Sequence, residues 1–175
     1  MTYTLLPPND PRVLSSIAEF DIERFKEDEK IELKEFADNM FETMKKYGGI
    51  GLSANQVGLP FRMFVMGGHP QIDSGKVRAV FNPLINDVSE ETVAMKEGCL
   101  SFPGVYAKVK RPEFVKMRAL DINGEVFEHE GVDYDGRCML HELDHLKGIT
   151  FFDRLSPLKR KMLEEKYFKR NRERL

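Results

Sequence analysis

The sequence is short of the residues and patterns that several classes of protein require. Its two cysteines can form one disulfide at most, which excludes a disulfide-stabilised scaffold and favours a reducing compartment. No segment approaches the roughly 20 apolar residues that a membrane span needs. The N-terminus lacks the basic and apolar regions of a signal peptide and is too acidic for an organelle transit peptide. We therefore expect a cytoplasmic protein that does not enter a membrane.

The length and composition favour one folded domain. The 175 residues are enough to bury a core, and 41% hydrophobic with 32% charged residues is typical of a globular protein. The chain has no internal repeat and no low-complexity tract. We expect residues 1–175 to form a single domain.

The charge is distributed unevenly along the chain. The net charge is −2 at pH 7, but residues 159–175 hold eight basic and three acidic side chains. This segment therefore carries +5, and the rest of the chain carries −7. Such an asymmetry indicates an anionic partner for the C-terminal segment.

Hydrophobic periodicity predicts three helices. Apolar residues recur at helical spacing over 28–49, and Gly48 and Gly49 end this pattern. Residues 134–148 are expected to form the second helix, with a glycine at its C-terminal end. Residues 156–175 form the third, which begins with a serine N-cap and a proline in the first turn.

Strands are predicted between the helices, over residues 61–68, 76–85 and 113–131. The last stretch contains Asn123-Gly124 between alternating apolar residues, which is a strong hairpin signal. Because strands and helices do not alternate along the chain, we expect an α+β fold built on antiparallel sheet.

The stretch HELDH at 141–145 indicates a metal site. Residues four apart lie on one face of a helix, so His141 and His145 can direct their imidazoles at one ion. Glu142 lies about 100° around the helix, where it can reach water on that ion without binding the ion. The alternative is a surface helix with two unrelated histidines, which a chain with only four histidines makes less attractive.

A catalytic metal site usually needs a third protein ligand. Cys138 and His145 are seven residues apart, about 10 Å along a helix axis, which bonds of about 2.0–2.3 Å do not easily bridge. A ligand from another element fits better, and Cys138 is then a small core residue beside the site. The sequence offers these candidates outside the motif: Cys99, His69, His129 and Glu164.

A glycine-rich stretch, GGIGLSANQVG at 48–58, is typical of a loop whose backbone lies against a substrate. A phosphate-binding loop is the alternative. It fails because no Lys-Ser/Thr pair follows, and the G-x-G-x-x-G pattern ends at Ala54.

Three stretches of this chain together resemble the motifs of the peptide deformylases, which are G-φ-G-φ-A-A-x-Q, E-G-C-L-S and H-E-x-D-H. The chain has GIGLSANQ at 49–56, EGCLS at 97–101 and HELDH at 141–145, and the order and separations agree. The flanking sequence extends the similarity over nearly the whole chain. Ser53 departs from the usual alanine of the family, and Leu140 stands where relatives often have glutamine.

The resemblance implies that Cys99, His141 and His145 bind one divalent metal ion and leave a fourth tetrahedral position for water. Deformylases commonly use Fe(II), and zinc or nickel can occupy the same ligands; the ligand set alone does not select among them. We expect antiparallel sheets packed around a central metal-binding helix, followed by a C-terminal helix.

The implied reaction removes the formyl group from N-formylmethionyl nascent peptides and releases formate. The metal lowers the pKa of water, Glu142 acts as the general base, and it then protonates the leaving amine. The resemblance makes the Gln56 side-chain amide and the Leu100 backbone N–H the donors to the oxyanion.

The substrate backbone is expected to pair with the main chain at Ile50, Gly51 and Gly98, like an added strand. Met95 and Cys138 are candidates for the pocket that receives the methionine side chain. Arg137 is expected to extend past this pocket toward solvent. The resemblance also raises an ion pair between Glu97 and Arg111, against the alternative of two independent surface charges.

The basic helix at 158–175 has two interpretations. It can be a solvated helix packed by its apolar side, or it can contact ribosomal RNA near the exit tunnel, as in some deformylases. We expect a monomer with no membrane partner. The rival enzyme is a zincin-type peptidase with Glu164 or Glu165 as its third ligand, and the non-enzymatic rival is a ribosome-binding protein with a closed structural metal site.

Overall fold

Two antiparallel sheets and three helices make up the part of the chain that the computed structural model describes, residues 1–19, 21–23, 25 and 32–171. The helices are α2 (Leu33–Lys46), α3 (Asp133–Leu146) and α4 (Pro157–Arg170). One sheet has the order β1-β2-β3-β6-β7, and the other pairs β4 with β5. The strands are β1 (Gly51–Ser53), β2 (Met63–Met66), β3 (Arg78–Val88), β4 (Thr92–Gly98), β5 (Tyr106–Pro112), β6 (Phe114–Leu120) and β7 (Val126–Val132). Short 3-10 turns are η1 (Ala54–Val57), η2 (Asp73–Gly75) and η3 (Phe151–Arg154).

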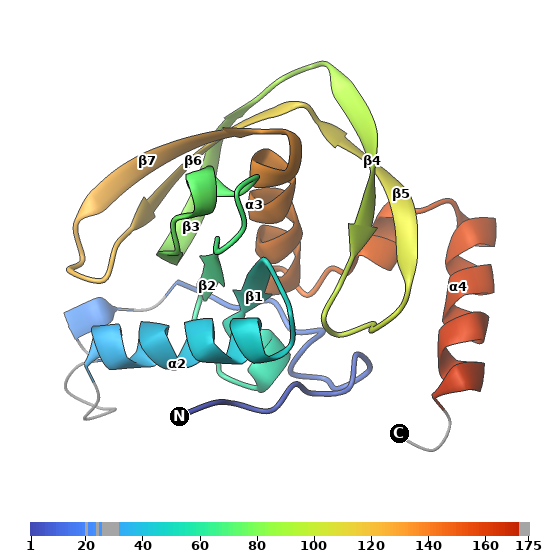
Figure 1. Ribbon diagram of the computed structural model, residues 1–175, viewed down its shortest axis with the longest axis horizontal. Coiled ribbons are helices and arrows are strands. Elements are labelled where there is room, and N and C mark those ends of the chain that lie inside the picture. The colour runs from blue at the N-terminus through green and yellow to red at the C-terminus, as the bar shows by residue number, and fades with distance from the viewer. Residues whose placement is uncertain (20, 24, 26–31, 172–175) are drawn as a thin grey trace.

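Helix α3 lies at the centre of this arrangement (Figure 1). It contacts β1, β2, β6 and β7 of the larger sheet, while α2 packs against β1 and β2. The β4–β5 ribbon stands beside α3, and α4 lies on the outside (Figure 1). The expected architecture, antiparallel sheets around a central helix with a helix at the C-terminal end, is therefore confirmed.

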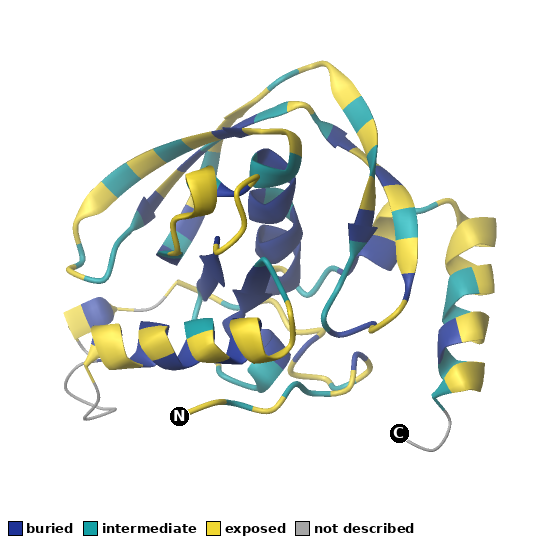
Figure 2. Ribbon diagram, in the orientation of Figure 1, coloured by how far each residue is buried: buried dark blue, intermediate teal, exposed yellow. Residues whose placement is uncertain are grey.

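Helix α3 is mostly buried, although several of its side chains are polar or charged. Figure 2 shows it buried over most of its length, whereas α4 is largely exposed. Ten of its fourteen residues are buried, and these include charged and histidine side chains. A buried polar group is costly unless it is hydrogen-bonded or paired. The polar side chains of α3 therefore need partners on the neighbouring strands.

Gly148, with φ of 72°, follows the end of the helix as predicted.

The predicted helices correspond to α2, α3 and α4, and the predicted strands at 61–68 and 76–85 correspond to β2 and β3. Residues 172–175 of the third predicted helix lie outside the described residues. In α2 the apolar face is buried at Leu33, Phe36, Met40 and Met44, while residues 28–31 of the predicted helix lie outside the described residues. The predicted hairpin forms between β6 and β7, which pair from Phe114↔Val132 to Leu120↔Val126 around a glycine turn.

The β4–β5 ribbon was not predicted. Its strands pair from Thr92↔Pro112 to Gly98↔Tyr106, and its lysines are exposed on one face. Lysine is uncommon in strands, which weakens the pattern in the sequence. The glycine-rich stretch 48–58 also differs from a simple loop, since it contains β1 and η1. Among the described residues, no helix is both long enough and apolar enough to pass through a bilayer.

Candidate metal centre

Two elements meet at the candidate metal centre. Cys99 follows directly after β4, and His141 and His145 lie one turn apart on α3. Cys99 Sγ is 3.1 Å from His145 Nε2, and one ligand atom from each of the three residues lies within 4.8 Å of the others. Tetrahedral donors on bonds of about 2.0–2.3 Å would stand roughly 3.5 Å apart. The donor set therefore fits one ion of the zinc or ferrous type, with a fourth position left open.

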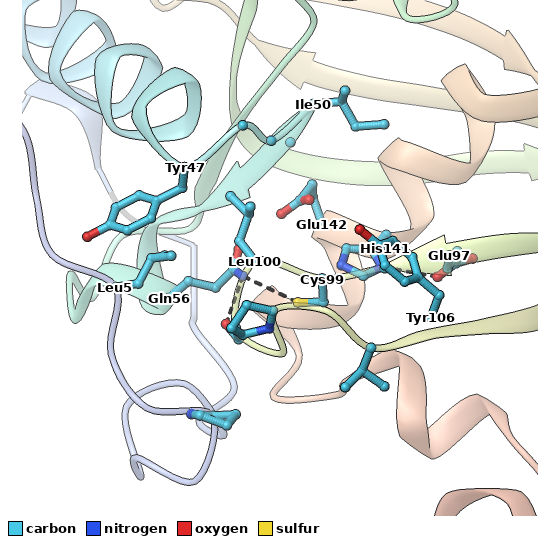
Figure 3. A pocket seen from close by; sticks show the side chains of 18 of the residues that line it. Leu5, Tyr47, Ile50, Gln56, Glu97, Cys99, Leu100, Tyr106, His141 and Glu142 are labelled. Atoms are coloured by element: carbon cyan, nitrogen blue, oxygen red, sulfur yellow. Dashed lines mark hydrogen bonds and ion pairs between the residues drawn. The ribbon is translucent and has the colours of Figure 1, made fainter. Parts of the chain in front are cut away.

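Glu97 sets the orientation of His141. The Glu97 Oε2 atom lies 3.0 Å from His141 Nδ1, and this interaction leaves Nε2 to face the centre (Figure 3). A carboxylate behind a histidine is the usual support for a metal ligand. Among the described residues, the other buried ring nitrogen of His145, Nδ1, has no hydrogen-bond partner.

The thiol of Cys99 is suited to bind a cation. Burial alone would raise its pKa, but the neighbouring His145 and His141 rings lower that pKa well below the ordinary value for cysteine. A thiolate, not a thiol, is the form that binds metals. Cys138 behaves differently, because burial raises the pKa of its thiol and its sulfur lies 3.5 Å from the Ile50 carbonyl oxygen.

A buried network of charges surrounds the centre. Arg111 donates to Glu97 at 2.6 and 3.0 Å and to Asp144 at 2.8 Å. Arg137 donates to Glu97 at 2.6 Å, and Arg154 donates to Asp144 at 3.0 Å. The Glu97–Arg111 pair is therefore structural, and not two independent surface charges.

Arg137 corrects one expectation from the sequence. It does not extend to solvent but is 4% exposed and also donates to the Val109 and Val93 carbonyl oxygens. Sequence reasoning also missed Asp144, although it lies within the HELDH motif. Only the fold brings Arg111 of β5 and Arg154 of η3 to the Asp144 carboxylate.

Glu142 lies beside the centre with its carboxylate between β1 and α3. Its side chain is buried, and Ser53 Oγ lies 2.8 Å from its Oε2 atom. Burial raises the pKa of this carboxyl group above its ordinary value. A carboxyl group with a raised pKa is better suited to act as both general base and general acid, because its pKa is closer to the pH of the reaction.

The Gln56 side chain is fixed at both ends. Its Oε1 accepts the Ser53 backbone N–H at 2.9 Å, and its Nε2 lies 3.0 Å from Ser101 Oγ and 3.6 Å from Cys99 Sγ (Figure 3). No hydrogen bond within the described part of the chain engages the Leu100 backbone N–H. The Leu100 N–H is thus a donor without a partner among these residues, while the Gln56 amide donates to Ser101 and to the Cys99 sulfur.

A cavity of about 880 Å³ opens onto these groups. The predicted site residues among those that line it are Ile50, Gly51, Gln56, Gly98, Cys99, Leu100, Cys138, His141 and Glu142. His145 is absent from the lining and is almost fully buried. Met95, a candidate for the methionine pocket, is also absent from the lining.

The rejected ligand candidates have other partners. His129 Nε2 lies 2.8 Å from an Asp135 oxygen, and Glu164 pairs with Arg160 at 2.7 Å on α4. In the described residues the only group of at least three candidate ligands is Cys99 with the two α3 histidines. The structure therefore gives no support to the zincin-type alternative.

An open three-ligand centre with a buried carboxylate beside it defines a metal-dependent hydrolase. Comparisons with known proteins narrow this class. The family model for polypeptide deformylase matches residues 4–161. The peptide deformylase of Thermotoga neapolitana is 42% identical over 134 residues, covering 77% of this chain and 79% of that protein. The crystal structure of a peptide deformylase from Legionella pneumophila superposes with a TM-score of 0.86 at 34% identity, covering 99% of this chain and 98% of that one.

The chain belongs to the peptide deformylase family. Its activity is the metal-dependent hydrolysis that removes the formyl group from an N-terminal formylmethionine. A further relative, the chloroplastic/mitochondrial peptide deformylase 1B of Arabidopsis thaliana, is 46% identical over 124 residues, covering 71% of this chain and 45% of that protein. The family therefore has organellar members.

Proposed function

We propose that Cys99, His141 and His145 hold a ferrous ion as the working metal of this deformylase, and that zinc or nickel can occupy the same donors. The convergence of the three ligand atoms within 4.8 Å carries this proposal. When bound, the ion supplies a Lewis acid that lowers the pKa of water and polarises the formyl oxygen. One soft thiolate with two imidazoles suits these ions better than calcium or magnesium.

Glu142 is the proposed general base and general acid. It accepts a proton from the attacking water and returns it to the methionine nitrogen as the formyl C–N bond breaks, so formate and a free amine leave. Its burial and raised pKa support both steps. Positioned proton transfer of this kind contributes typically about 10²–10⁴-fold to a rate.

Gln56 and Leu100 are the proposed donors to the oxyanion that develops on the formyl oxygen. The Gln56 amide is held by Ser53 and Ser101, so its Nε2 stays beside Cys99. The Leu100 N–H is a second donor that no hydrogen bond among the described residues consumes. Donors fixed before the reaction stabilise the charge without the cost of reorganising them.

The formylated peptide is proposed to bind in extended form against Ile50, Gly51 and Gly98. Strand β1 is at one edge of its sheet, and β4 has only β5 as a partner. Both strands contribute residues to the cavity wall, so both have an edge that can pair with a substrate backbone. Cys138 and Ile50 belong to one apolar cluster with Tyr134, which suits a methionine side chain.

Residues 1–175 are proposed to act as one cytoplasmic, monomeric catalytic domain. The basic segment at 158–175 is proposed to contact ribosomal RNA, because its described residues, most of them in α4, include basic side chains that are exposed. Binding through phosphates weakens steeply with salt. Deletion of residues 159–175 should therefore lower ribosome affinity at low salt. An unchanged affinity in co-sedimentation would contradict the RNA contact.

The direct test of the proposed roles is formate release from a formyl-Met tripeptide by protein purified anaerobically with ferrous iron. The wild type should release one formate per peptide, and a Glu142→Gln variant should keep its iron and lose the activity. Iron retained by a Cys99→Ser variant at the wild-type ratio would contradict the ligand assignment.

A further inference from the structure

Strand β1 contacts the carboxylate of Glu142 through two residues. Ser53 Oγ lies 2.8 Å from Glu142 Oε2 and 2.9 Å from the backbone oxygen of Glu142. Gly51 is two residues earlier in the strand and therefore faces the same side. A Cβ at Gly51 would collide with Glu142 Oε1 and lie 2.8 Å from Cys138 Sγ. The serine thus binds one carboxylate oxygen, and the glycine leaves space for the other.

The two oxygens of this carboxylate are consequently not equivalent. Oε2 is held by the Ser53 hydroxyl, while no hydrogen bond from the described residues reaches Oε1. Oε1 is also not among the buried atoms that lack a partner. Glu142 and Gly51 both line the cavity. Oε1 is therefore the oxygen that remains available to water and substrate.

The position of Ser53 makes this hydrogen bond effective. Ser53 is fully buried and Glu142 is 3% exposed, so the bond lies in a medium of low dielectric constant. A hydroxyl that donates to a carboxylate forms one of the stronger hydrogen bonds in proteins. A glutamate side chain without such a contact has several rotamers available. The hydroxyl limits that freedom at the carboxylate itself.

The second acceptor of Ser53 completes the arrangement. A hydroxyl carries one proton, and here either Oε2 or the backbone oxygen of Glu142 can accept it. The buried hydroxyl is therefore paired through Glu142, at its carboxylate and at its backbone oxygen.

We propose that Ser53 is a positioning residue for Glu142, whose hydroxyl fixes Oε2 so that Oε1 faces the formyl group of the substrate. The inference rests on the proposed role of Glu142 as the base. Ser53 touches neither substrate nor metal, and acts only through this carboxylate. An alternative is that the hydroxyl merely ties β1 to α3 through the backbone oxygen, which is a structural role.

The experiment compares S53A with a matched control in the iron-loaded enzyme. Alanine is smaller than serine and is the usual residue of the family motif at this position, so S53A should fold. The control is T43V, which removes a second fully buried hydroxyl. That hydroxyl donates to the Asn39 carbonyl oxygen at 2.7 Å and accepts the Tyr3 backbone N–H at 2.9 Å. Formate release gives kcat and KM, and iron content and the thermal midpoint are measured on the same samples.

S53A is expected to lower kcat by about 3- to 10-fold, the size of one lost hydrogen bond, because the family motif combines alanine at this position with the same glutamate. KM and iron content should stay within about twofold of the wild type, because Ser53 contacts neither the bound substrate nor the metal ligands. T43V should lower the thermal midpoint and keep the wild-type kcat, because among the described residues its hydroxyl bonds only to Asn39 and Tyr3. A wild-type kcat in S53A, an equal loss in T43V, or a loss that follows the iron content would each overturn the proposal.

A double-mutant cycle separates this inference from the proposed function. In single-turnover experiments S53A is expected to have no further effect in an E142Q background, because the two residues act as a unit. A full S53A effect in that background would overturn the positioning role while the base role stands. Wild-type activity of E142Q alone would instead refute the base role.

Discussion

Among the residues that are not proposed metal ligands, Glu97 is the one whose replacement should disturb the metal centre most. It is 5% exposed and accepts hydrogen bonds from Arg111 at 2.6 and 3.0 Å and from Arg137 at 2.6 Å. Its second oxygen also lies 3.0 Å from His141 Nδ1. A Glu97→Ala substitution therefore removes the shared partner of two buried guanidinium groups and one histidine.

The expected loss of stability follows from these contacts. Removing one partner of a buried ion pair costs about 3–5 kcal/mol, because the remaining charge is left uncompensated. Arg111 retains Asp144 at 2.8 Å, and Arg137 retains two backbone carbonyl oxygens. These remaining partners keep the expected loss for Glu97→Ala within that range of about 3–5 kcal/mol, although two guanidinium groups are affected. The loss of support for His141 should lower the metal affinity about 10- to 100-fold.

Urea unfolding followed by circular dichroism measures the first effect, and competition with a chelator measures the second. The control is Asp38→Ala, which breaks an exposed pair with Lys34 whose side chains are 72% and 56% exposed. The Asp38→Ala substitution should lower the free energy of unfolding by less than about 1 kcal/mol. If Glu97→Ala costs no more than the control, the argument from burial is wrong. If stability falls and the metal affinity does not, the coupling through His141 is wrong.

Three further predictions concern the cavity and the ligands. Gly51→Ala should abolish formate release while leaving the fold intact, because its Cβ would displace the Glu142 carboxylate; normal turnover would show that this contact relaxes. Gln56→Ala should lower kcat by about 10²–10³-fold, the usual cost of one oxyanion donor, and a kcat near that of the wild type would refute the role. Cys99→Ser should lower the bound metal measured by elemental analysis, whereas Glu164→Gln should not; the reverse result would restore the zincin-type assignment.

The parts of the fold that the sequence predicted are those with a strong local signal. The Asn123-Gly124 turn and the alternating residues around it predict β6 and β7, and the 3.6-residue periodicity predicts α2 and α3. The β4–β5 ribbon was not predicted, because its exposed lysines are also typical of a polar loop. Its buried residues Val109 and Arg111 do not form an apolar pattern. Arg111 is stable there only because Glu97 and Asp144 meet it.

By itself, the sequence determined the chemistry available to this protein. The spacing of His141 and His145, with Glu142 between them, is set by helix geometry and needs no tertiary information. The third ligand was decided by the fold, because Cys99 reaches the histidines only where β4 ends beside α3. The fold also decided the hydrogen bond between Ser53 and Glu142, since the two residues are 89 positions apart in the sequence. Contacts between distant segments depend on how the sheet and helix pack, which local residue patterns do not encode.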